Sequence, residues 1–371
     1  MAFRCPHCGA EFDATLFEFG REVTCRCGRR VAAGHVLSLG ETPGETRPPE
    51  EGGGEEPEVK VLVTGATGFV GRALTRTLVE RGAQVRCLVR PSSDRAVLSG
   101  VNCEFVEGDL ARPETLGPAL EGCSTVVHLG AETLPASVSR LHTVNVVGSG
   151  ELARLAKAGG VERFVYLSTL NRARHGARLP RGWAIVARSK LAGESAVLKH
   201  TPAVILRSAP CFGPNDHLAC PLMARLRRPW PLTWFPGQGT FQTQPIWIGD
   251  LAESLALAAL EGKAESTPRE LAGPAIISVI DFWDALAEAL GVFRVRLHLP
   301  ETWLRLTGFT LSRLCGRIES LRLAETFIAH SASERNFAPV LLGRPLVSVR
   351  EGLEIMLAGP EKREAPAEAG A

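Results

Sequence analysis

The chain has 371 residues, of which 45% are hydrophobic and 22% are charged, and its formal net charge is +2. These proportions are typical of a globular protein, and the near-neutral charge argues against a nucleic acid or another acidic polymer as partner. No apolar run reaches the roughly 18 residues that a membrane-spanning helix needs, and the first residues lack the apolar core of a signal peptide. A cytoplasmic location is therefore expected, in which ten cysteines indicate thiols or metal ligands rather than disulfides.

Residues 1–40 contain two short cysteine pairs, Cys5 with Cys8 and Cys25 with Cys27, each followed by glycine. Four thiolates form a tetrahedral zinc site, and the glycine turns free backbone amides to bond the sulfurs. Because so short a segment cannot build its own hydrophobic core, a structural zinc is expected there. The segment resembles a zinc ribbon, although its second pair is C-x-C. A redox dithiol, an iron–sulfur site and reduced thiols are the alternatives.

Composition divides the rest of the chain into three parts. Residues 41–58 are acidic, rich in proline and glycine, and lack large apolar residues, so they are expected to form a flexible linker. Residues 59–358 alternate short apolar runs with amphipathic stretches and form the main domain. Residues 359–371 are polar, rich in alanine and glutamate, and are expected to be a disordered tail.

The alternation in the main domain predicts a doubly wound α/β fold. Strands are predicted at Val59–Val63, Gln84–Val89, Cys103–Val106, Thr125–Leu129, Arg163–Leu167 and Ala203–Leu206. Helices are predicted at Val70–Arg81, Glu114–Glu121, Ser139–Ala158 and Trp183–Lys199. Strands that alternate with helices are joined by right-handed crossovers, which give a parallel sheet of the Rossmann type.

A glycine-rich turn follows the first predicted strand of this domain. In such a turn Gly65 allows the tight bend, Gly68 lets the backbone approach a diphosphate, and Gly71 lets the next helix pack closely on the sheet. The helix N-terminus then faces the phosphates. The turn therefore predicts a nicotinamide dinucleotide site, and the residues predicted to form it are Thr64, Gly65, Thr67, Gly68, Phe69, Val70 and Gly71.

The end of the second strand bears on the choice of cofactor. In this type of fold an acidic residue there binds the adenosine ribose 2′-hydroxyl, whereas an arginine accommodates a 2′-phosphate. The second strand ends in Val89-Arg90 without an acid, and Arg72 lies just after the glycine turn. NADP(H) is therefore predicted in preference to NAD(H). The alternative is that Arg90 is an exposed arginine on a strand end.

Several motifs, in order, resemble those of the extended short-chain dehydrogenases/reductases, the group that includes the NAD-dependent epimerase/dehydratases. Thr64–Gly71 matches TGxxGxxG, and Val126–Ala131 resembles the segment of the fourth strand that lines the cofactor. Leu206–Pro214 resembles LRPxxVYGP, and Gln244–Ala252 resembles Q-P-V-H-V-x-D-V-A. The resemblance implies a Rossmann-type sheet with a smaller C-terminal substrate lobe.

The resemblance also implies roles for individual residues. Asp109 and Leu110 follow the third strand, where the family binds adenine, and Asn145 stands at the family's asparagine position. Three residues at the end of the fourth-strand segment would line the cofactor, namely Leu129, Gly130 and Ala131.

The family's catalytic pattern is broken at one position. The family uses a Tyr-x-x-x-Lys pair with a serine or threonine, in which the tyrosine is the acid/base and the lysine lowers its pKa and holds the nicotinamide ribose. Lys190 and Thr169 stand at the lysine and hydroxyl positions, but Val186 occupies the tyrosine position. Valine has no proton to give, whereas Lys190 can still bind the ribose.

The alternative is that another residue replaces the missing tyrosine as the acid. The single tyrosine, Tyr166, lies on the fifth strand and is expected to pack between sheet and helix. Three residues in the loop after Thr169 could reach the site, although loop residues of this kind are more often solvated: Arg172, Arg174 and His175.

A dinucleotide-binding fold without the catalytic tyrosine is similar to atypical members of the superfamily. These include the branch related to the nucleotide-binding accessory subunit of respiratory complex I. The similarity implies an NAD(P)-binding oxidoreductase-like protein without classical acid/base catalysis. One alternative is an active reductase or epimerase that uses a substitute acid. The other is a non-enzymatic assembly or regulatory protein whose zinc ribbon recruits a partner. The aromatic and arginine-rich stretch Met223–Pro236 suits a hydrophobic or anionic small molecule, or else caps the core.

Overall fold

The computed structural model describes residues 59–133, 138–170, 181–229, 232–236, 238–261, 267–299 and 331–358, together with five short strands among the first 40 residues. These strands are β1 (Ala2–Arg4), β2 (Glu11–Asp13), β3 (Val23–Thr24), β4 (Arg30–Val31) and β5 (Leu37–Ser38). β1 pairs antiparallel with β2 and β5, and β3 pairs antiparallel with β4. The predicted zinc ligands, the linker and the tail lie outside the described residues.

Seven parallel strands form the main sheet. They are β6 (Lys60–Thr64), β7 (Gln84–Val89), β8 (Cys103–Glu107), β9 (Thr125–His128), β10 (Arg163–Thr169), β11 (Val204–Ser208) and β16 (Arg269–Leu271). Their order is β16-β11-β10-β9-β6-β7-β8. The predicted doubly wound parallel sheet is confirmed, and the six predicted strands agree with the observed ones to within two residues at each end. β16 was not predicted, because its three residues, Arg-Glu-Leu, carry no strand pattern.

The order of the strands fixes where a ligand can bind. From β6 the chain winds outward through β7 and β8, and it then returns to β9 on the other side of β6. The point between β6 and β9 is a topological switch point, and open parallel sheets bind ligands in the crevice outside the carboxyl ends of such strands. Thr64 and His128, the last residues of the two strands, are partners in the ladder there.

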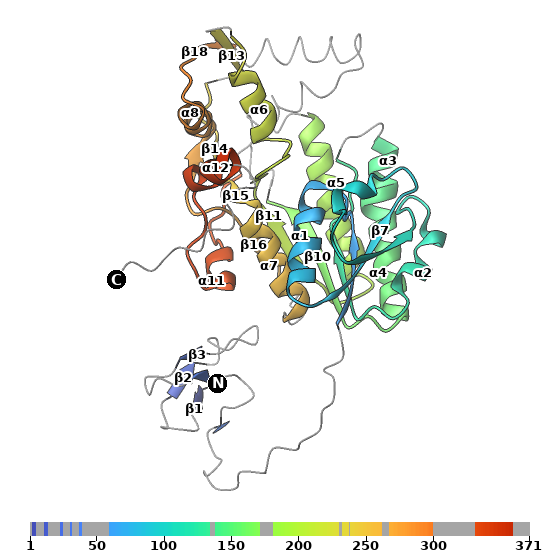
Figure 1. Cartoon of the computed structure of the whole chain (residues 1–371). Helices are drawn as coiled ribbons and strands as arrows, with labels where there is room; N and C mark the ends of the chain where they lie inside the picture. Colours follow the sequence, from blue (N-terminus) through green and yellow to red (C-terminus); the bar gives the residue numbers. More distant parts are fainter. Residues whose placement is uncertain are drawn as a thin grey trace.

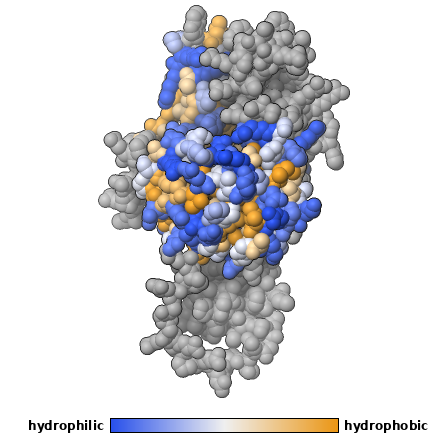
Figure 2. Space-filling view, turned by 90° about the vertical axis from the view of Figure 1, so that its right-hand side faces the viewer, coloured by the Kyte–Doolittle hydropathy of each residue, from blue (hydrophilic) through white to orange (hydrophobic). Residues whose placement is uncertain are grey.

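Helices cover both faces of the sheet (Figure 1). One face packs against α1 (Phe69–Glu80) and α7 (Ile248–Leu260), and the other against α2 (Gly117–Leu120), α4 (Ser149–Ala158) and α5 (Arg181–Leu198). Val61 and Val63 belong to the first core and Leu62 to the second, and all three are fully buried. A strand that is buried on both sides reads as a continuous apolar run rather than an alternating one. Figure 2 views the α2 and α4 side, whose surface mixes hydrophilic and hydrophobic residues.

Two predicted helices are broken in the structure. The stretch Ser139–Ala158 comprises α3 (Val138–His142), a π-helical turn at Thr143–Gly148, and α4. The stretch Glu114–Glu121 is a 3₁₀ turn, Pro113–Thr115, followed by α2. A π turn has a wider backbone ring than an α turn and is frequent at functional sites. Apolar periodicity cannot distinguish it from a continuous α-helix.

The C-terminal lobe is built from short elements that are shown in yellow to red in Figure 1. They include β12 (Cys211–Phe212), α6 (Ala219–Leu226), β13 (Leu232–Pro236), β14 (Gln242–Thr243), β15 (Ile246–Trp247), β17 (Ile277–Ser278), α8 (Val279–Ala289), β18 (Val295–Leu299), α11 (Ala338–Leu342) and α12 (Val349–Ala358). Phe212 is fully buried at the centre of the lobe, with edge-on ring contacts to Trp247 at 5.4 Å and Phe282 at 5.9 Å. Such aromatic pairs stabilise the lobe beyond the area that they bury.

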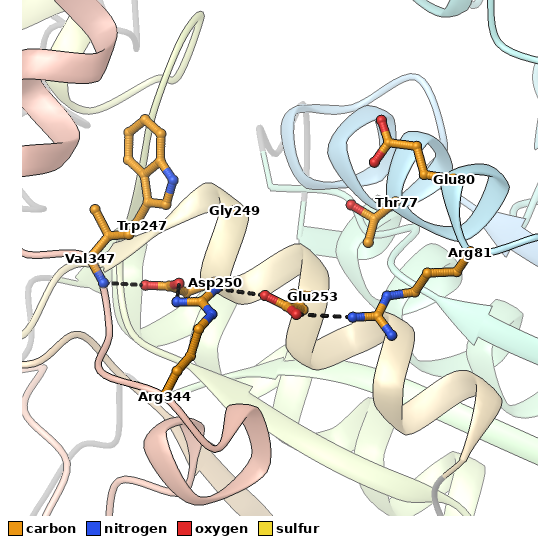
Figure 3. Close-up of a pocket in the computed structure, with 9 residues that line it drawn as sticks. All are labelled: Thr77, Glu80, Arg81, Trp247, Gly249, Asp250, Glu253, Arg344 and Val347. Carbon is orange, nitrogen blue, oxygen red and sulfur yellow. Dashed lines mark hydrogen bonds and ion pairs between the residues drawn. The ribbon is translucent and has the colours of Figure 1, made fainter. Parts of the chain in front are cut away.

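A chain of ion pairs fastens the C-terminal segment to the sheet side of the molecule (Figure 3). Asp250 is buried on α7, and its carboxylate accepts the Val347 amide at 2.8 Å and pairs with Arg344 at 2.8 Å. Arg344 also pairs with Glu253 at 2.6 Å, and Glu253 pairs with Arg81 of α1 at 2.9 Å. These residues line a cavity of about 310 Å³ whose lining includes none of the predicted cofactor residues. Arg81, Asp250, Glu253 and Arg344 pair with one another there, which joins α1, α7 and the segment before α12.

No helix in the part of the chain that the structure describes is both long enough and apolar enough to span a bilayer.

Glu194 of α5 and Arg207 of β11 form a buried ion pair that is joined by two hydrogen bonds. Arg207 Nε donates to Glu194 Oε1 at 2.9 Å, and a second bond joins Nη2 to Oε2. Glu194 is 4% exposed and Arg207 is 9% exposed. The pair ties α5, which carries Lys190, to the sheet. Removing one partner of a buried pair leaves an uncompensated charge in the interior.

We therefore expect Glu194→Gln to lower the free energy of unfolding by about 3 kcal/mol. The matched control is Glu151→Gln, which removes the carboxylate of the more exposed Glu151–Arg154 pair on α4 and should cost at most about 0.5 kcal/mol. Urea unfolding followed by circular dichroism measures both. Equal losses in the two variants would contradict the prediction.

Candidate functional site

The turn after β6 is shaped by two glycines that touch other backbone. Gly65 has φ +71°, and a Cβ there would lie 2.9 Å from the Gly130 amide nitrogen in the turn after β9. A Cβ on Gly71 would lie 2.0 Å from the Gly65 carbonyl oxygen. Neither position has room for a larger residue, so the turn and the first turn of α1 pack as closely as backbone allows. Gly65 thus makes a tight bend at positive φ, and Gly71 brings α1 against the backbone of Gly65 and Ala66.

The N-terminus of α1 has the features of an anion cradle. Gly68 is its N-cap, no side chain caps the helix, and the first turn contains no acidic residue. The first amides of a helix have no intrahelical acceptor and carry the positive end of the helix dipole, so they bind anions. A Cβ on Gly68 would lie 3.2 Å from the Gly65 carbonyl oxygen, within the cradle itself. The residues present therefore fit a diphosphate.

The structure brings most of the predicted cofactor residues together around this cradle. Thr64 ends β6, and a Cβ on Gly130 would lie 3.0 Å from Thr64 Oγ1 and 2.8 Å from Leu110 Cδ1. Leu129 and Ala131 flank Gly130 and are half-buried. Asp109 begins the turn after β8, where its carboxylate accepts the Ala111 amide at 2.9 Å. The turns that follow β6, β8 and β9 thus meet at the switch point.

The two arginines considered for a 2′-phosphate differ in the structure. Arg72 Nη2 donates to the Asn215 carbonyl at 2.8 Å, and its guanidinium lies 5.6 Å from the ring centre of Phe69. Arg72 therefore links α1 to the loop after β12. Arg90 is exposed just after β7, and its backbone amide donates to Ser93 Oγ at 3.1 Å. Arg90 remains the better candidate.

Below the cradle, buried polar groups form a line of hydrogen bonds that begins at the glycine turn. Thr64 Oγ1 accepts the Gly130 amide at 3.0 Å and lies 2.6 Å from His128 Nδ1. The Tyr166 hydroxyl donates to the Lys190 carbonyl, so it accepts from Ser149, and Ser149 in turn accepts from His128 Nε2. The proton of His128 is therefore on Nε2, and Nδ1 accepts from Thr64 Oγ1. Burial, and secondarily the charge of Lys190, lowers the pKa of His128 to about 3, so the ring is neutral.

The line continues to α5. His128 Nε2 lies 2.8 Å from Ser149 Oγ on α4, and Ser149 bonds the hydroxyl of Tyr166. The Tyr166 hydroxyl donates to the Lys190 carbonyl oxygen at 3.2 Å. The glycine turn is thereby connected, through buried groups only, to the backbone of the residue at the family's lysine position. Each donor along the line finds an acceptor, as buried polar groups require.

Lys190 has a pKa that lies closer to neutral pH than that of an ordinary lysine. Its Nζ donates to the Leu167 carbonyl at 2.8 Å and lies 5.5 Å from the ring centre of Tyr166. Burial lowers the pKa of Lys190 to about 8, while the Glu194 carboxylate acts in the opposite direction. Tyr166 is 2% exposed, and burial raises the pKa of its hydroxyl. As expected from the sequence, Tyr166 packs between sheet and helix and does not reach the surface of the site.

The start of the Val186–Lys190 turn is held by the π turn. Asn145 is fully buried there, and its amide donates to Ser189 Oγ at 2.8 Å, while Ser189 Oγ donates to the Val186 carbonyl at 2.7 Å. Asn145 Oδ1 also accepts the Glu132 amide at 2.7 Å. Asn145 thus positions the helix that carries both Val186 and Lys190. The half-buried Val186 contributes only hydrocarbon at the position of the family's acid.

The hydroxyl position lies at the end of β10. Thr169 is its last residue and is half-buried, whereas the neighbouring Ser168 Oγ is buried and has no hydrogen-bond partner among the described residues. The loop residues considered as substitute acids, Arg172, Arg174 and His175, lie outside the described residues.

Sequence reasoning missed the His128–Ser149–Tyr166 line. A histidine that ends an apolar run, Thr125-Val126-Val127-His128, was the available signal, because all four residues are buried and a buried imidazole needs a partner on each nitrogen. Ser149 gave no signal of its own, since serine is common near helix starts.

Comparisons with known proteins agree with this arrangement. The 2-alkyl-3-oxoalkanoate reductase of Stenotrophomonas maltophilia is 35% identical over 221 residues, which are 54% of this chain and 66% of that protein. The photosystem II assembly factor Ycf39 of Cyanophora paradoxa is 36% identical over 113 residues, which are 30% of this chain and 35% of that protein. The chain thus spans from about a third to about two thirds of the length of these curated relatives.

Among solved structures, the Bordetella bronchiseptica enzyme WbmG in complex with NAD has the same fold, with a TM-score of 0.64 and 18% identity over 84% of this chain and 94% of that chain. The model of the NAD dependent epimerase/dehydratase family matches residues 61–271, which run from β6 to the end of β16 and include the whole parallel sheet. The chain belongs to the NAD dependent epimerase/dehydratase family.

Proposed function

We propose that the chain binds NADP(H), in preference to NAD(H), and does so without tyrosine-dependent catalysis. The observation that carries the first part is the cradle of Gly65, Gly68 and Gly71 at the uncapped N-terminus of α1, where added side chains would meet backbone. The first amides of α1 would hold the diphosphate. Arg90 would hold the 2′-phosphate.

Other residues of the site complete the cofactor's surroundings. Asp109 and Leu110 would contact the adenine, and Leu129, Gly130 and Ala131 would line the space beside the cofactor. Lys190 would bind the nicotinamide ribose. When bound, the nicotinamide supplies a hydride donor or acceptor.

The second part of the proposal rests on the absence of a proton donor at position 186. Val186 cannot protonate an alkoxide, and Tyr166 is buried with its hydroxyl bonded to the Lys190 carbonyl. General acid catalysis requires a donor within hydrogen-bond reach of the reacting oxygen. The function that fits best is an oxidoreductase-like nucleotide-binding protein whose acceptor needs no protonation by tyrosine.

A second candidate function is a role in assembly or regulation, in which the predicted zinc ribbon would recruit a partner. Two observations favour it: valine replaces the acid in an otherwise retained site, and one relative is named as an assembly factor. Another relative is named as a reductase of 2-alkyl-3-oxoalkanoates, which supports the third possibility, a reductase with a substitute acid. Cofactor binding is common to all three, so it is tested first.

We expect NADPH to bind more tightly than NADH in calorimetric titrations of the full chain. Arg90→Ala should weaken NADPH binding roughly tenfold, because it removes a charge-assisted bond to the 2′-phosphate, and should leave NADH binding unchanged. Arg154→Ala, which removes an exposed arginine of α4, is the control and should change neither affinity. Equal affinities for the two cofactors would refute the assignment of Arg90, and binding of neither would refute the proposed function.

NADPH affinity should also fall as pH rises through about 8. Burial lowers the pKa of Lys190 to about 8, so its ammonium is charged below that pH and neutral above it, and the attraction for an anionic cofactor is lost on the alkaline side. In Lys190→Met the affinity should be lower at neutral pH and nearly independent of pH in this window. The measurement is the same titration at constant ionic strength; an unchanged slope in Lys190→Met would show that another group titrates.

A tyrosine at position 186 should restore ketone reduction, because it would supply the missing proton donor. We expect Val186→Tyr to raise NADPH oxidation, with a panel of ketones that includes a 2-alkyl-3-oxoalkanoate, by roughly 100-fold or more over the wild type. Val186→Phe has the same ring without the hydroxyl and should give no gain. Comparable rates in the wild type and Val186→Tyr would mean that a substitute acid already operates.

A further inference from the structure

A two-stranded parallel ribbon, β13 with β18, projects from the C-terminal lobe beside α6 and α8 (Figure 1). Leu232 pairs with Val295, and Thr233 pairs with Arg296. Thr233 is 6% exposed, and Arg296 forms an ion pair with Asp284 of α8. Because paired residues of a ribbon share a face, these contacts show that the polar face is turned toward the lobe.

At the start of the ribbon the opposite face is apolar and exposed, whereas further along it Leu297 is half-buried. Leu232 is 50% exposed, Val295 is 44% exposed, and Phe293, two residues before Val295, is 84% exposed. A ribbon on the surface of a globular domain normally places its apolar face inward and its polar face outward. The reversed pattern marks an interaction surface. At the top of Figure 2, hydrophobic and hydrophilic residues of this end of the lobe stand side by side.

Arginines border the apolar face. Arg225, Arg227 and Arg228, at the end of α6 and just after it, are exposed, and Arg294 Nη2 donates to the Arg228 carbonyl at 2.9 Å. Within the described parts of the chain, no carboxylate forms an ion pair with these four guanidinium groups. Among the described residues, no ion pair therefore offsets these four positive charges.

We propose that this end of the lobe, formed by Leu232, Phe293, Val295 and the four arginines, docks on the surface of an anionic lipid bilayer. Exposed aromatic and aliphatic side chains enter the boundary between headgroups and acyl chains, while arginines beside them contact lipid phosphates. Charge favours this occupant over a second copy of the chain, because two such surfaces would oppose arginines to arginines. The proposal is independent of cofactor binding.

Flotation of the full chain with vesicles tests the proposal. The chain should float with vesicles of phosphatidylcholine that contain about one third phosphatidylglycerol, remain unbound with phosphatidylcholine alone, and dissociate as salt is raised. The double variant Leu232→Ser/Phe293→Ser should reduce partitioning at least roughly tenfold through lost apolar burial. Arg227→Ala/Arg228→Ala should reduce partitioning to a similar extent and weaken its salt dependence, since only two of the four arginines remain.

Matched control variants distinguish binding through the proposed surface from non-specific binding to vesicles. Val340 of α11 is 63% exposed, and α11 lies at the opposite end of the lobe from β13 and β18 (Figure 1), so Val340→Ser should leave partitioning unchanged. Arg350→Ala removes an exposed arginine of α12 and should likewise have no effect. Failure to float with the anionic vesicles, or equal losses in the controls, would overturn the proposal. So would a dimer in light scattering that Leu232→Ser/Phe293→Ser dissociates, since the occupant would then be a second copy.

Discussion

The contact between the turns after β6 and β9 is the constraint on which the candidate site depends. Gly65 and Gly130 touch through backbone atoms, so the crevice at the switch point has a floor of main chain. Thr64 and His128 end the two strands directly beneath and bond to each other. A side chain at Gly65 would meet the backbone of Gly130 and push the two turns apart, and one at Gly130 would meet the side chains of Leu110 and Thr64. The position of the α1 N-terminus, and with it the anion cradle, follows from this approach.

Much of this architecture could be predicted from the sequence, because it is encoded locally. The apolar run before Gly65 and the spacing of the glycines reflect a strand buried on both faces and a turn without side chains. What escaped prediction depends on tertiary contacts. The π turn around Asn145 is stabilised by bonds to Glu132 and Ser189, and periodicity of apolar residues carries no trace of such bonds.

The same distinction holds at the level of single side chains. Arg72 and Arg90 are the same residue type, yet the Arg72 side chain bonds to the Asn215 carbonyl, whereas Arg90 is exposed just after β7. Asp250 matches a family motif, but in the structure it fastens the segment around Val347 to α7. Val186 is the opposite case. Its inability to act as an acid could be predicted from the residue type alone, because no arrangement of neighbours can make a valine side chain donate a proton.

The strand order also has a consequence for how the chain is made. β6 is an interior strand between β7 and β9, but β6 ends at Thr64 and β9 begins only at Thr125. During synthesis, β7 can pair with β6 early, whereas the other edge of β6 stays open until His128 has left the ribosome. An unpaired, wholly apolar strand edge is a template for wrong pairing. The nascent chain therefore passes through a stage in which one edge of this core strand is open to wrong pairing.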